Sequence, residues 1–337
     1  MVIRMGEKKL DKLLALETLK SSLSQESFDS LLDELGFTQA EFDRRMKGIY
    51  KEYDFILALH MLDICDSITL IDETYSSVFD VYSSDVLVSL KNGKKFLIEI
   101  KSTNDQSYSI SMGNLNNRIN YANKNGLELY FAISIAGGFW MLFESSYLLN
   151  NGGKIKIDDF HNTKLREILN IKSYAFLNYE FISIFSTRAD KHVIKGYYFD
   201  PYGELSSEEF KYNGKRVYKI KNREKDKSDF IKLFLFEALK DRSSNENQSI
   251  KDLGSGLTKI TEVGTNQCIS ELEFLLSPIK HLYRNNISSA KEYLDNLKDS
   301  DKKIDYNIHT IRYLLSTLKP SPIEIFTQKD LEKKRAY

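Results

Sequence analysis

The sequence of 337 residues predicts a two-part α/β protein. Leucine-rich helical spacing near the N-terminus gives way to short β-rich runs, and an Asn-Gly pair joins two of these runs. Helical patterns return after residue 228. We therefore expect an α/β sandwich of about 100 residues, followed by a region of mixed α+β and then helical structure.

The N-terminal segment, residues 7–63, predicts three helices. Its apolar residues recur near the helical repeat, and Ser27 or Ser30 could cap the second helix. Thr38 with Glu41 three residues later fits a capping box. A further helix is expected from about Gly48 to Ile64.

A β-hairpin is the firmest local prediction. Strands are expected over 85–90 and 95–101, because the Asn92-Gly93 pair between them tolerates the positive φ of a tight turn. Other β-rich runs precede it, at 67–71 and 78–82. A helix over 113–125 and strands over 127–134 and 139–143 follow it, which completes the α/β order.

The rest of the chain predicts an extension to the core. We expect strands at 175–185, 193–199 and 217–220, a linker at 241–256, and helices at 229–240, 265–283, 289–298 and 304–318. The expected domains are an N-terminal helical lead (1–44), the core (45–150), a mixed α/β extension (151–240) and a C-terminal helical region (257–337).

Charge and composition limit the classes of function. The chain carries 48 Lys+Arg and 48 Asp+Glu, yet residues 1–90 have a net charge of −8 and the remainder +8. A neutral total can therefore conceal a basic surface that binds nucleic acid. Two cysteines, Cys65 and Cys268, cannot form a disulfide framework or a four-ligand zinc site. No signal peptide or long apolar run is visible, so we expect a cytoplasmic protein without membrane contact.

Three charged residues stand at the ends of the predicted hairpin. Asp85 opens one strand, and Glu99 and Lys101 lie two apart on the other, so their side chains share a face. Charges at the end of an apolar strand are costly unless they have partners. Two carboxylates, with the Ile100 carbonyl as a third oxygen, suit Mg²⁺, and an adjacent ammonium can orient water or stabilise a phosphoryl transition state.

The acid, the hairpin and the Glu99-Ile100-Lys101 run resemble the PD-(D/E)XK nuclease superfamily, whose members share the restriction-endonuclease-like fold, a mixed sheet flanked by helices. The resemblance covers residues 45–143 and implies metal-dependent phosphodiester hydrolysis. It implies Asp85 and Glu99 as metal ligands, Lys101 as the catalytic lysine, and Mg²⁺ as the cofactor, with Mn²⁺ able to substitute. Ser84 occupies the position of the proline in the family motif.

The resemblance implies further site residues on the flanking elements. Many members add a Glu from the first helix as a metal ligand, and Glu52 is the natural candidate, with Asp54 as second choice. Asn117 and Arg118 occupy the helix position where some members carry a Gln or basic residue. The Ser102 hydroxyl could contact phosphate.

A second basic segment lies outside this core. Residues 211–223 hold six Lys and Arg around an Asn-Gly turn, which predicts a basic hairpin. Lys215, Arg216 and Lys219 could contact phosphates while Tyr212 or Tyr218 stacks on a base. A solvated hairpin with its aromatic side chains packed inward is the alternative.

These observations predict an Mg²⁺-dependent DNA endonuclease. The resemblance implies a role in restriction or anti-phage defence. A homodimer is a further hypothesis, because two cuts on duplex DNA need two centres. The alternatives are an RNA-specific or structure-specific, resolvase-like nuclease, and a catalytically silent module that binds nucleic acid.

Overall fold

The computed structural model describes residues 7–20, 22–71, 84–136, 138–188, 198–199, 202–221, 227–240, 247–277 and 307–325. The chain divides into two compact units. The first comprises the described residues within 1–56, 65–137 and 142–157, and the second those within 57–64, 138–141 and 158–337. Among the described residues, no helix has the length and apolar character needed to cross a membrane.

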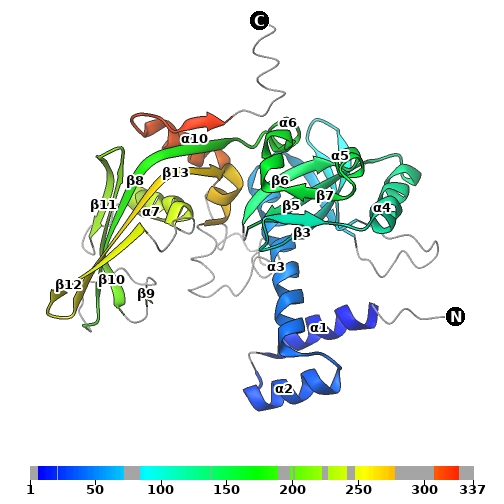
Figure 1. Cartoon of the computed structure of the whole chain (residues 1–337), viewed down its shortest axis with the longest axis horizontal. Helices are drawn as coiled ribbons and strands as arrows, with labels where there is room; N and C mark the ends of the chain where they lie inside the picture. Colours follow the sequence, from blue (N-terminus) through cyan, green and yellow to red (C-terminus); the bar gives the residue numbers. More distant parts are fainter. Residues whose placement is uncertain are drawn as a thin grey trace, which may run out of the picture. The chain divides into compact units, whose positions relative to one another are not determined.

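The first unit contains most of a five-stranded mixed sheet with the order β1-β2-β3-β5-β6 (Figure 1). The strands are β1 (Cys65–Leu70), β2 (Val86–Leu90), β3 (Lys95–Ser102), β5 (Glu128–Ile135) and β6 (Phe139–Glu144). The first three strands pair antiparallel, whereas β3 pairs parallel with β5. Parallel neighbours need a crossover, and helix α4 (Met112–Lys124) supplies it.

The predicted core elements agree with this sheet. The hairpin turns at Asn92-Gly93, where Gly93 has a φ of 86° and the Asn92 side chain accepts a hydrogen bond from the Lys94 amide at 3.0 Å. Ser111 caps α4. The run at 78–82 lies outside the described residues. Smaller elements complete the unit: β4 (Ser107–Ser109), which pairs with β7 (Lys154–Lys156), and α5 (Ser145–Asn150).

Three helices precede the sheet: α1 (Glu7–Lys20), α2 (Gln25–Glu34) and α3 (Gln39–Met61). Ser24 caps α2, not Ser27 or Ser30. Thr38 caps α3 as predicted, since its hydroxyl accepts from the Glu41 amide at 3.2 Å. The separate helix expected from Gly48 is instead the continuation of α3, because one glycine lowers helix stability without ending the hydrogen-bonded ladder.

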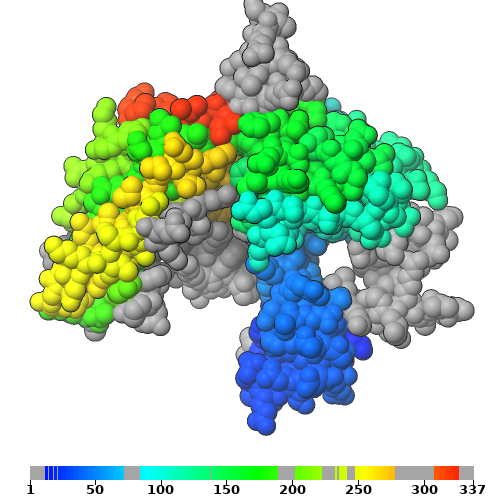
Figure 2. Space-filling model, viewed as in Figure 1, coloured from blue at the N-terminus to red at the C-terminus, as the bar shows by residue number. Residues whose placement is uncertain are grey.

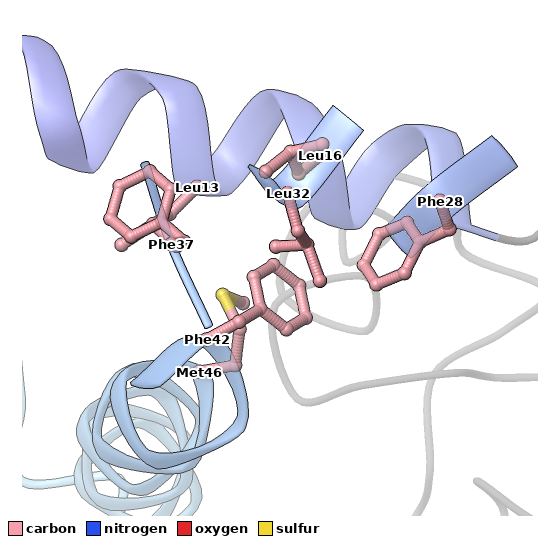
Figure 3. Close-up of a cluster of buried hydrophobic side chains, with 7 residues drawn as sticks. All are labelled: Leu13, Leu16, Phe28, Leu32, Phe37, Phe42 and Met46. Carbon is pink, nitrogen blue, oxygen red and sulfur yellow. The ribbon is translucent and has the colours of Figure 1, made fainter. Parts of the chain in front are cut away.

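A small apolar core joins these helices (Figure 3). It is formed by Leu13, Leu16, Phe28, Leu32, Phe37, Phe42 and Met46. The rings of Phe28 and Phe42 meet edge to face, with centroids 5.2 Å apart. Burial of these side chains fixes one face of the N-terminal half of α3 against α1 and α2. All three helices are coloured blue in Figure 2.

The second unit contains a larger sheet with the order β11-β10-β8-β13-β12. Its strands are β8 (Ser173–Ser186), β10 (Gly203–Tyr212), β11 (Lys215–Lys221), β12 (Gln248–Gly254) and β13 (Leu257–Ser270). Two short strands, β9 (Tyr198–Phe199) and β14 (Ile323–Ile325), pair with β10 and β8. Its other elements are η2 (Ile157–Asn162), α6 (Leu165–Leu169), α7 (Lys227–Lys240) and α10 (Ile308–Thr317).

Two C-terminal predictions are wrong. The polar segment expected as a linker over 241–256 contains β12, an edge strand with most of its residues exposed. The helix expected over 265–283 begins only at residue 271, because β13 runs to Ser270 and pairs with β8 over most of its length. Helices at 229–240 and 304–318 are confirmed approximately by α7 and α10, and the run at 289–298 lies outside the described residues.

Candidate active site

The β2–β3 ladder ends just before the site. Val86 and Ile98 form its last pair. Beyond them, the Ile100 amide donates a hydrogen bond to Oδ2 of Asp85, 2.6 Å away. The carboxylate of Asp85 thus takes the place of the next strand partner, which fixes that side chain against the backbone of β3.

The three predicted catalytic side chains lie together. The Lys101 ammonium is 2.7 Å from Oε1 of Glu99 and 3.3 Å from Oδ2 of Asp85. Glu99 is fully buried, while the Lys101 side chain keeps 27% of its surface exposed. The end of β3 therefore presents two carboxylates and one cation, with the cation at the accessible side.

Arg118 completes the charge cluster from helix α4. Its Nε lies 2.6 Å from Oε1 of Glu99, and only 9% of its side chain is exposed. The predicted role of Arg118 was a contact with nucleic acid. Its burial and its ion pair instead favour a role in holding Glu99 in place. Asn117, the neighbouring candidate, is half-buried on the same helix.

Burial changes the protonation equilibrium of Glu99. Desolvation and the nearby Asp85 charge raise its pKa to about 7, although Lys101 and Arg118 act in the opposite direction. At neutral pH this carboxyl therefore stands near the middle of its titration. A cation that binds here would favour the ionised form.

Lys101 stays protonated. Desolvation lowers its pKa, but the attraction of Asp85, Glu99 and Glu52 outweighs desolvation, and the net shift is upward. The Glu52 carboxylate on α3 is thus close enough to act on the site. In the described part of the chain, however, no group of three His, Cys, Asp or Glu side chains could hold a metal ion, so Glu52 does not join Asp85 and Glu99 in such a group.

The residues present fit a hard divalent cation. Oε2 of Glu99 is buried and has no hydrogen-bond partner among the described residues. Such an oxygen is costly to bury without compensation. Mg²⁺ is bound in proteins by one or two carboxylates and keeps several waters. Asp85 and Glu99 meet this requirement, and the Ile100 carbonyl stays a predicted third ligand.

Two further residues lie beside the cluster. Ser102 ends β3, is half-buried, and pairs in register with Ser134 of β5. Tyr108 of β4 was missed by the sequence prediction. Burial raises its pKa, and the charges of Lys101, Glu99, Arg118 and Asp85 all act on its phenol. Tyr108 is a single tyrosine in a polar segment, so no sequence pattern predicted that it lies beside the charged cluster.

The basic hairpin belongs to the second unit. Strands β10 and β11 form it as predicted, and Lys215 and Arg216 are exposed beside its turn. Lys219 forms an ion pair with Glu209 at 2.9 Å. Tyr212 and Tyr218 are 1% and 3% exposed, so the prediction that either stacks on a base is wrong. The alternative, aromatic side chains packed inward, is what the hairpin shows.

The comparisons with known proteins concern the same segment that carries the acid pair. Residues 76–175 match the family model described as archaeal Holliday junction resolvase, a family within the PD-(D/E)XK nucleases. This segment belongs to the PD-(D/E)XK nuclease superfamily. The matched range of this nuclease core contains Asp85, Glu99, Lys101 and Arg118, and it begins after helix α3.

A comparison with solved structures gives a match to part of this chain. The Holliday junction resolvase Hjc of Archaeoglobus fulgidus is 17% identical in sequence, with a TM-score of 0.31. The alignment covers 36% of this chain and 99% of that one. A comparison with curated proteins finds no significant match.

Proposed function

We propose that this protein is a metal-dependent nuclease that hydrolyses phosphodiester bonds in branched DNA. The observation that carries the proposal is the buried cluster at the end of β3, where Glu99 and Asp85 both contact the Lys101 ammonium inside the matched nuclease segment. Asp85 and Glu99 would hold Mg²⁺, with Mn²⁺ as a substitute.

The chain's own residues would divide the chemistry between them. The Ile100 amide and Arg118 hold the two carboxylates in place, which avoids reorganisation when substrate binds. Lys101 stays charged, so its ammonium can donate to the scissile phosphate and stabilise the negative charge that develops there. When bound, the metal supplies Lewis-acid activation of water and of the phosphate.

The substrate class follows from the family description. A match to a Holliday junction resolvase model supports the structure-specific alternative over the restriction or anti-phage role. A junction has two strands to cut. We therefore propose that two copies of the chain act together, with one centre for each strand.

Cleavage assays test this function. Fluorescently labelled four-way DNA junctions, linear DNA duplexes and single-stranded RNA are incubated with the full chain in Mg²⁺. We expect the wild type to cut the junction, and Lys101→Ala to lose at least about a hundredfold in rate. Lys95→Ala removes the same charge at the exposed start of the same strand and should leave the rate unchanged.

The same assays separate the alternatives. Preferential cutting of RNA would replace DNA as the substrate. Salt-sensitive binding without any cleavage would identify a silent binding module. Equal rates for the wild type and Lys101→Ala would remove Lys101 from the catalytic assignment.

A further inference from the structure

A polar cleft of about 320 Å³ lies between helix α3 and the loop that follows β3. Arg44, Lys47 and Lys51 line it from the helix. Ser102 and Asn104 line it from the loop, and Ser102 directly follows the catalytic Lys101 in the chain. The loop side of the cleft therefore begins one residue after Lys101 in the chain.

The charge of the cleft is unexpected for this part of the sequence. Residues 1–90 have a net charge of −8. The apolar residues Phe42 and Met46 turn one face of α3 toward α1 and α2 (Figure 3). Arg44, Lys47 and Lys51, at helical spacing, share the opposite face. Positive charge is thus gathered on one side of a helix in an acidic segment.

Contacts within the cleft leave much of this charge accessible. The Lys47 ammonium donates to Oδ1 of Asn104 at 2.8 Å, which joins the helix to the loop through a neutral acceptor. Lys51 lies 3.7 Å from Asp54. Asp105 also lines the cleft, and its carboxylate accepts from the Thr103 hydroxyl at 3.4 Å. Arg44 and Lys47 are both exposed.

Two features of the lining are not explained by packing within the fold. Gly48 lines the cleft in the middle of α3, although glycine is a poor helix residue. A Cβ added there would meet no atom within 4 Å, so the fold itself does not require glycine. Ser134 also lines the cleft. It is 1% exposed, and its Oγ has no hydrogen-bond partner among the described residues.

We propose that this cleft binds the phosphodiester backbone of the DNA strand next to the bond that is cut. The inference rests on the proposed function and adds a binding site to it. Arg44 and Lys47 would pair with phosphate oxygens, Gly48 would permit close approach of the strand, and the Ser134 hydroxyl would donate a hydrogen bond. A nucleic acid backbone suits the cleft because its charges repeat along the strand toward Lys101.

The test compares neighbouring arginines. Arg44→Ala and Arg45→Ala remove the same charge from the same helix, but Arg45 pairs with Glu41 at 3.0 Å and does not line the cleft. Binding of a fluorescein-labelled four-way junction is measured by anisotropy in EDTA at several NaCl concentrations. We expect Arg44→Ala/Lys47→Ala to weaken binding about tenfold and to reduce the salt slope by about 2. Arg45→Ala should change neither quantity.

A second variant tests the space itself. Gly48→Leu improves helix propensity and fills the cleft, so it should weaken junction binding while the melting temperature stays the same or rises. Unchanged affinity and slope in both Arg44→Ala/Lys47→Ala and Gly48→Leu would overturn the cleft proposal.

Cleavage by the same proteins keeps the two proposals distinct. If the wild type cuts the junction and the cleft variants bind as the wild type does, only the cleft proposal fails. If the wild type never cuts but the cleft variants still bind more weakly, hydrolysis fails and the cleft stands. Absence of any nucleic acid binding by the wild type would overturn both.

Discussion

Arg118 Nε lies 2.6 Å from Oε1 of Glu99, and both side chains are almost completely buried. This contact joins the crossover helix α4 to strand β3. A buried carboxylate is stable in its ionised form only with close cations. Arg118 and Lys101 are the two cations within ion-pair distance of Glu99 among the described residues, and only Lys101 has substantial access to solvent.

Arg118→Met should therefore destabilise the fold. At about pH 9, where Glu99 is mostly ionised, loss of one partner leaves its buried charge poorly compensated, at a cost on the order of 3 kcal/mol in the free energy of unfolding. The double variant Arg118→Met/Glu99→Gln should recover most of that loss, because no buried charge remains, yet stay inactive. Chemical denaturation measures both. If the two substitutions add without any recovery, Arg118 does not act through Glu99.

The raised pKa of Glu99 predicts a pH dependence of stability without metal. A carboxyl whose pKa rises from 4.5 in the unfolded chain to about 7 in the folded chain binds its proton more tightly when folded. Its contribution favours the fold below about pH 4.5 and is lost as the pH rises through 7. The expected change is a few kcal/mol.

Glu99→Gln provides the comparison, because it cannot titrate. The difference in unfolding free energy between wild type and Glu99→Gln, measured in EDTA from pH 4.5 to 8, should shift steadily against the wild type. A difference that is constant with pH would mean that burial does not raise the pKa of Glu99. Added Mg²⁺ should reverse the trend above pH 7, since it stabilises the ionised carboxylate.

The inward tyrosines of the basic hairpin predict a structural role. The Tyr218 hydroxyl lies 2.6 Å from Oε1 of the buried Glu208. Tyr218→Phe removes a hydrogen bond to a buried carboxylate and should lower stability by about 1–3 kcal/mol. DNA affinity should stay unchanged at temperatures where the variant is folded. A large loss of affinity with normal stability would restore the base-stacking interpretation.

The core was predictable because its signals are local. The Asn92-Gly93 turn fixes the register of the hairpin, and period-two alternation places Glu99 and Lys101 on one face. The partner role of Arg118 was not predictable, because it depends on how α4 is rotated against the sheet. The sequence around Arg118 shows only a charged residue in an amphipathic helix.

The strands β12 and β13 of the second unit could not be predicted from local sequence patterns, for a different physical reason. Edge strand β12 has most of its residues exposed, so it lacks an alternating apolar pattern and its polar composition is typical of a linker. The pairing of β13 with β8 is a contact between residues far apart in sequence. That pairing extends the strand to Ser270, although apolar residues further along favoured an earlier helix.

We propose that Asp85 and Glu99 together bind a divalent cation. Anomalous scattering from a crystal soaked in Mn²⁺ locates such an ion. We predict an anomalous peak within coordination distance of both carboxylates in the wild type and no peak there in Glu99→Gln. A fully occupied Mn²⁺ elsewhere, with no peak beside Asp85 and Glu99, would show that these two carboxylates do not form the metal site.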